Sequence, residues 1–80
     1  MRLSFYVGRD CHLCELARAE LERLREELGF ELDEVDVTGV PALEERYRRF
    51  LPVVELEGER LFVYRIDEDV LRERVARPGE

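Results

Sequence analysis

The chain has 80 residues and lacks Lys, Asn, Gln and Trp entirely, with one His and two Cys. Two cysteines are too few for the disulfide framework of a small secreted protein. No apolar run approaches the ~20 residues that span a membrane. The short apolar stretch at the N-terminus is not followed by a small-residue cleavage site, so we expect a cytoplasmic protein.

Chain length and net charge limit the number of domains and the classes of partner. A chain this short holds one hydrophobic core, so residues 1–80 are expected to form a single domain. The formal net charge is −7. An acidic chain is repelled by phosphates and anionic lipids, which excludes nucleic acid and membranes as partners. We expect a monomer whose partners are other proteins or small molecules.

Hydrophobic periodicity predicts four strands and three helices. The strands are expected at residues 2–7, 32–37, 53–56 and 60–64, and the helices at 11–28, 42–50 and after Asp67 or Asp69, one of which caps the last helix. A helix between the first two strands makes them parallel. Glu57-Gly58 or Gly58-Glu59 marks a hairpin between the last two. The order βαβαββα predicts an α/β fold with a four-stranded mixed sheet flanked by helices.

The long first helix is expected to bury one apolar stripe and to end at Gly29. The residues of this stripe are Leu13, Leu16, Ala17, Leu21, Leu24 and Leu28. In the last helix, Val70, Leu71 and Val75 are expected to face inward. Residues 77–80 are expected to form a frayed tail.

Cys11 and Cys14 lie where the first helix begins. Residues three apart on a helix share one face, so the two sulfurs can form a disulfide without unfolding the turn. The free N–H groups and positive dipole end of the first turn stabilise a thiolate, which is the form that attacks a disulfide. We expect Cys11 to be the more exposed thiol with the lower pKa, and Cys14 to be the resolving thiol.

The cysteines and the residues next to them each have more than one possible role. His12 adds positive charge below about pH 6.5, or is only an exposed spacer. Asp10 disfavours a thiolate, unless it serves as the helix N-cap. The cysteines themselves are alternatively inert core residues. One His and two Cys offer at most three zinc ligands, so no metal site within one chain is expected, whereas a metal or cluster shared across a dimer stays open.

A strand that ends at Val7, a C-x-x-C motif that opens a helix, and a lone Pro52 before a hairpin together resemble the glutaredoxin and thioredoxin family. The chain is about as long as a minimal glutaredoxin-like domain, so the resemblance is to glutaredoxins more than to thioredoxins. The resemblance implies a thioredoxin fold and a dithiol thiol–disulfide oxidoreductase, with Cys11 attacking and Cys14 resolving. It implies no bound cofactor, and glutathione or a flavin-dependent reductase as the source of electrons.

The resemblance also implies roles in substrate binding. Leu51-Pro52 matches the cis-proline position, where the backbone of Leu51 pairs with the substrate; Pro52 is otherwise only the proline of a strand start. Asp67 matches the residue that meets the amino group of glutathione. Arg9 stands beside the position of a typical lysine, which is Gly8 here. With His12, these residues form the predicted binding set.

One departure weighs against efficient use of glutathione. Glutaredoxins carry two glycines shortly before the aspartate that Asp67 matches, and these glycines let the glutathione backbone approach closely. In this chain the residues before Asp67 are Tyr64-Arg65-Ile66.

Two further groups have open roles. Arg46, Arg48 and Arg49 steer an acidic partner, or only form a solvated helix face. Tyr6 and Tyr64 line the groove, or only pack. Two other functions also stay open: a redox-sensing or partner-binding module without catalysis, and a metal or cluster carrier that acts as a dimer.

Overall fold

A computed structural model describes residues 1–76 and shows a four-stranded mixed sheet with the strand order β2-β1-β3-β4. The strands are β1 (Arg2–Val7), β2 (Glu31–Asp36), β3 (Val53–Leu56) and β4 (Glu59–Val63). The helices are α1 (His12–Leu28), α2 (Pro41–Tyr47), the 3-10 turn η1 (Arg48–Phe50) and α3 (Glu68–Val75). β1 is parallel to β2 and antiparallel to β3, which is antiparallel to β4. The predicted order of elements and the α/β fold are confirmed.

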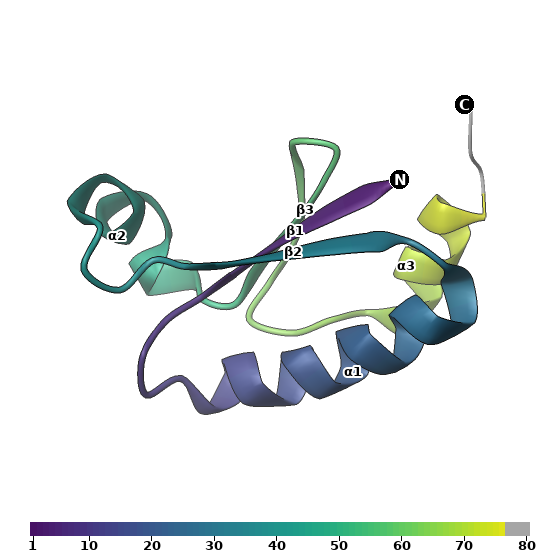
Figure 1. Cartoon of the computed structure of the whole chain (residues 1–80), viewed down its shortest axis with the longest axis horizontal. Helices are drawn as coiled ribbons and strands as arrows, with labels where there is room; N and C mark the ends of the chain where they lie inside the picture. Colours follow the sequence, from purple (N-terminus) through teal and green to yellow (C-terminus); the bar gives the residue numbers. More distant parts are fainter. Residues whose placement is uncertain (77–80) are drawn as a thin grey trace.

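Alternation along β1 separates two layers of packing. Leu3, Phe5 and Val7 point to one face of the sheet, and Tyr6 points to the other. In Figure 1, α1 runs below the strands, α3 lies at the right near the C-terminal end of α1, and α2 lies at the left. The larger core lies between the sheet and the helices α1 and α3. A smaller core lies on the opposite face of the sheet, where α2 packs.

Both ends of α1 have identifiable caps. Cys11 is the N-cap, because its Sγ accepts a hydrogen bond from the backbone N–H of Cys14 at 3.1 Å. Gly29 is the predicted C-cap, and its positive φ of 80° lets its N–H donate to the Arg25 carbonyl at 2.8 Å. Asp10 is not the cap: it has left-handed geometry with φ 55° in the preceding turn.

The main core contains most of the predicted α1 stripe but not its first members. Cys14, Ala17, Leu21 and Leu24 are buried at spacings of three and four residues. The prediction was wrong for Leu13 and Leu16, whose exposed fractions are 45% and 51%. They lie to one side of the buried stripe, where no other described element covers them.

In α3, as in α1, only some of the residues predicted to face inward are buried. Leu71 is buried and Val75 packs against the main core, as predicted. Val70 faces outward with an exposed fraction of 40%, so its inward prediction was wrong. The helix is capped by Asp67, whose Oδ1 accepts a hydrogen bond from the Val70 N–H at 3.2 Å. A helix of two turns can bury only a narrow face, and Leu71 occupies it.

The smaller core is organised around a buried carboxylate. Tyr47 of α2 stacks on Tyr6 of β1, with ring centroids 4.0 Å apart. Glu55 of β3 accepts hydrogen bonds from the hydroxyls of Tyr47 at 3.0 Å and Tyr6 at 3.5 Å. Burial raises the pKa of Tyr47, and the hydrogen bond to Glu55 adds to this effect. The two phenols satisfy a carboxylate that would otherwise be costly to bury.

Several boundaries differ from those predicted. The helix expected over 42–50 is α-helical only to Tyr47 and then tightens into η1, because the chain must turn extended before Pro52. The last strand ends at Val63, one residue early, because Tyr64 adopts a left-handed φ of 70°. The Glu57-Gly58 hairpin is present. The predicted frayed tail, residues 77–80, lies outside the described residues.

No helix within residues 1–76 is both long and apolar enough to cross a membrane. The prediction that all 80 residues form one domain stays a prediction.

The different positions of Leu16 and Leu21 on α1 can be tested by matched substitutions. We expect Leu21→Ala to lower the free energy of unfolding by about 2–5 kcal/mol, because it removes a fully buried side chain. Leu16→Ala should cost less than about 1 kcal/mol, since leucine and alanine have similar helix propensities. Urea unfolding of both variants measures the difference. Equal losses would contradict the described core.

The buried Tyr47 should make the protein less stable in alkali. Its raised pKa means that the folded state keeps the phenol proton while the unfolded chain loses it above about pH 10. Stability is therefore complete below that pH and falls as the pH rises through it. Tyr47→Phe should flatten this fall and cost about 1–3 kcal/mol at neutral pH, because Glu55 loses a donor. Unfolding free energies at pH 8 and 10.5 test this, and identical alkaline slopes would refute it.

Candidate active site

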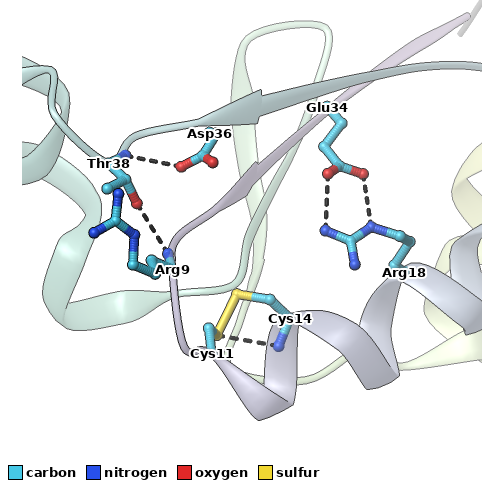
Figure 2. Close-up of polar contacts among 7 residues, drawn as sticks. All are labelled: Arg9, Cys11, Cys14, Arg18, Glu34, Asp36 and Thr38. Atoms are coloured by element: carbon cyan, nitrogen blue, oxygen red, sulfur yellow. Dashed lines mark hydrogen bonds and ion pairs between the residues drawn. A yellow bond between two sulfur atoms is a disulfide. The ribbon is translucent and has the colours of Figure 1, made fainter.

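The two cysteines form a disulfide at the junction between the β1–α1 loop and α1 (Figure 2). Their Cα atoms are 5.2 Å apart. Cys14 belongs to the main core and is only 1% exposed, whereas Cys11 is half-buried at the start of the helix. The predicted difference in exposure is confirmed: an external reagent meets the sulfur of Cys11 before that of Cys14.

Local electrostatics favour negative charge on Cys11. Its sulfur accepts the Cys14 N–H, which is one of the free donors of the first helical turn. The same hydrogen bond in the reduced form would stabilise a thiolate, and the α1 dipole acts in the same direction. A sulfur that serves as a helix cap is thus prepared for nucleophilic chemistry by the backbone alone.

The Leu51-Pro52 segment lies against the loop that leads to the cysteines. The Leu51–Pro52 peptide bond is cis, as the resemblance implied. A Cβ atom on Gly8 would lie 2.6 Å from Cδ1 of Leu51, so glycine is what lets Leu51 pack against this loop. Gly8 was missed as a site residue. Its signal in the sequence was the absence of a side chain where the resemblance expects lysine.

Arg9 does not face the disulfide. Its backbone N–H donates to Oγ1 of Thr38 at 2.9 Å, and its side chain points away from the sulfurs in Figure 2. Thr38 in turn donates its N–H to Asp36 at 2.9 Å, and this hydrogen bond lowers the pKa of Asp36. Arg9 thus joins the β1–α1 loop to the β2–α2 loop through its main chain. His12 is exposed on the first turn of α1.

The arginines before Pro52 have separate surroundings. Arg46 lies over the Tyr47 ring at 5.3 Å, which places it beside the smaller core. Arg48 pairs with Glu44 at 3.3 Å. Its Nη1 would lie 3.5 Å from a Cβ on Gly8, so Arg48 is the member of this group that reaches the β1–α1 loop. Arg49 contributes its carbonyl to a hydrogen bond from Tyr64.

Tyr64 joins the end of β4 to the proline loop. Its N–H donates to the Pro52 carbonyl at 2.9 Å, and its hydroxyl donates to the Arg49 carbonyl at 3.0 Å. Tyr64 and Asp67 both line a groove of about 910 Å³ between α1 and the β4–α3 loop, which also includes Leu13 of the cysteine motif. Tyr6 lies on the other face of the sheet, so only one of the two tyrosines lines this groove.

The charged residues of the motif region are not arranged as a metal centre. Within residues 1–76, no group of three or more His, Cys, Asp or Glu side chains is placed to hold a metal ion. Arg18 on the second turn of α1 is instead held by Glu34 of β2 through two hydrogen bonds of 2.8 and 2.9 Å (Figure 2). This bidentate pair fastens the first part of α1 to the edge of the sheet.

The close contact between Gly8 and Leu51 predicts a specific response to a small substitution. Gly8→Ala should displace the Leu51 side chain, since the new Cβ would overlap its Cδ1 atom. Because the end of a leucine side chain can rotate away, the loss of stability should stay below about 1 kcal/mol. A shift of the Leu51 methyl signals in NMR spectra, with little change in urea unfolding, is the expected result. Unmoved Leu51 methyl signals would contradict the contact.

Comparison with known proteins places this site in a family. The family model of the Glutaredoxin-like domain (DUF836) matches residues 2–76. An uncharacterized protein of Mycobacterium tuberculosis is 36% identical over 72 residues, which cover 84% of this chain and 74% of that protein. The solution structure of protein Ne2328 from Nitrosomonas europaea is 32% identical with a TM-score of 0.77, covering 91% of this chain and 88% of that one.

The same fold also occurs in proteins of much lower sequence identity. Thioredoxin 1 from Thermosipho africanus superposes with a TM-score of 0.66 at 14% identity, covering 95% of this chain and 94% of that one. At this identity the likeness shows the fold alone. With its C-x-x-C motif at Cys11 and Cys14, the chain belongs to the glutaredoxin-like domain family and has the thioredoxin fold.

Proposed function

We propose that the protein is a dithiol thiol–disulfide oxidoreductase that reduces disulfides through Cys11 and Cys14. The observation that carries this proposal is the asymmetric pair at the start of α1: Cys11 is half-buried and its sulfur accepts a helix N–H, whereas Cys14 is fully buried in the main core. In this arrangement the outer thiol can attack a substrate disulfide, and the inner thiol can then displace the bound substrate. The reaction belongs in a reducing cytoplasm, where disulfides are transient.

The reaction proceeds in two exchanges. The Cys11 thiolate attacks one sulfur of a substrate disulfide, forms a mixed disulfide and releases the first substrate thiolate, which takes up a proton. The Cys14 thiol then loses its proton and attacks the sulfur of Cys11. The second substrate thiol leaves, and the Cys11–Cys14 disulfide remains. Two electrons have moved from the protein to the substrate.

Two equivalents of a low-molecular-weight thiol such as glutathione, or a flavin-dependent reductase, return these electrons. The backbone of Leu51, next to the cis peptide bond, is proposed to pair with the bound substrate. Asp67 and His12 are proposed to contribute at the edges of the site, although one oxygen of Asp67 is already engaged as the α3 cap. Arg9 contributes through the loop that it supports rather than through its guanidinium.

A redox titration tests this function. In thiol–disulfide buffers, followed by alkylation and intact mass, the Cys11–Cys14 pair should interconvert reversibly with a potential of roughly −180 to −270 mV. Cys11→Ser should abolish reduction of a neutral small disulfide. Cys14→Ser should accumulate a mixed disulfide, because the resolving thiol is gone.

Other outcomes would point elsewhere. If Cys14→Ser reduces protein disulfides at the normal rate, the two-cysteine scheme is wrong. A single oxidation that changes partner affinity without turnover would indicate a redox sensor. A coloured, metal-containing dimer would indicate a carrier of a metal or cluster.

A further inference from the structure

The groove beside the cysteine motif is open and apolar along one side. Leu13 and Leu16 of α1 and Tyr64 of the β4–α3 loop line it, with exposed fractions of 45%, 51% and 46%. Leu13 and Leu16 stand one turn apart on α1, and exposed apolar side chains that share a groove are typical of a binding surface. Leu13 belongs to the C-x-x-C motif, so the groove begins within two residues of Cys11 along the chain.

The rim of the groove is acidic. Glu20, Asp67, Glu68 and Asp69 face it, against a single cation, Arg65. Two of the four carboxylates are already occupied. Glu68 is paired with Arg23 and Arg72, and Asp67 caps α3.

The other two carboxylates are available to a ligand. Glu20 and Asp69 have no ion-pair partner among residues 1–76. Glu20 lies on α1, and Asp69 lies at the start of α3. The apolar strip therefore has an unpaired acid on each of the two helices that border it, which suits a cationic ligand and repels an anionic one.

Tyr64 is held in one position on the wall of the groove. Its left-handed φ of 70° is unusual for an aromatic residue, and its two hydrogen bonds to the Pro52 and Arg49 carbonyls hold it there. Its exposed ring forms part of the groove lining. An extended peptide can lay an apolar side chain against this ring and the leucines.

We propose that this groove binds an extended segment of a disulfide-bonded protein in which apolar and basic side chains flank the reactive cysteine. This inference rests on the proposed reductase function and names its substrate class. The apolar side chains pack on Leu13, Leu16 and Tyr64, and the basic ones approach Glu20 and Asp69. Oxidised glutathione, which is small and carries net negative charge, is a poor substrate for the same reason.

The test compares three disulfides with the reduced protein. Two are dimers of a five-residue peptide in which Leu and two charged residues flank Cys, with Arg in one and Glu in the other. The third is a neutral small disulfide that measures basal exchange. At low ionic strength the Arg dimer should react about tenfold faster than the Glu dimer and faster than oxidised glutathione. The preference should shrink with added salt.

Matched variants locate the preference in the groove. Glu20→Gln with Asp69→Asn should bring the Arg-to-Glu rate ratio close to that expected from net charge alone. Glu26→Gln with Glu45→Gln removes the same charge from exposed positions outside the groove and should leave most of the ratio intact. Tyr64→Gly should speed reaction with oxidised glutathione relative to the Arg dimer.

The outcomes separate this inference from the function beneath it. Equal rates for the Arg and Glu dimers, with the neutral disulfide reduced, would overturn the substrate class and leave the reductase intact. A ratio that falls equally in both double variants would assign the preference to net charge and overturn the groove. If even the neutral disulfide is not reduced, the proposed function fails, and this inference fails with it.

Discussion

The packing of the first turn of α1 into the main core is the constraint on which the site depends. Cys14 is buried among the side chains of β1 and α1, so its sulfur cannot move far from the sheet. Cys11 stands one turn earlier and caps the helix through its sulfur. The Arg18–Glu34 pair holds the same stretch of α1 to β2. The helix therefore keeps the two Cα atoms 5.2 Å apart, close enough for the S–S bond to break and form again without refolding the turn.

Around this turn, three connections far apart in the sequence meet. The β1–α1 loop carries Gly8, against which Leu51 of the η1–β3 connection packs. The β4–α3 connection joins them through Tyr64, whose hydrogen bonds reach Pro52 and Arg49. The smaller core under α2 supports this arrangement from the other face, because Tyr47 lies directly before η1 and is held by Glu55. The surroundings of the cysteines are thus connected by main-chain hydrogen bonds and by the close contact of the Leu51 side chain with Gly8.

Apolar surface and negative charge occur together beside the cysteine motif. Exposed leucines and two carboxylates without ion-pair partners among residues 1–76 line the groove that includes Leu13, and the chain as a whole carries a net charge of −7. This combination is the basis for the proposed preference for cationic, partly apolar protein segments over small anions. Specificity would then arise from the groove, while reactivity arises from the helix terminus.

The sequence by itself determined the order of elements, the parallel first pair of strands, the final hairpin and the cysteine pair, because periodicity, turn residues and the C-x-x-C spacing are local. The antiparallel pairing of β1 with β3, which sets the strand order, came only from the tertiary structure. It could not decide which leucines of α1 are covered: Leu13, Leu16 and Leu21 have the same chemistry, and only the position of the neighbouring elements separates them. The direction of the Arg9 side chain, the contact of Leu51 with Gly8 and the bridge made by Tyr64 likewise join residues distant in the chain. Such contacts depend on where the sheet brings separate loops together, and only the tertiary structure decides that.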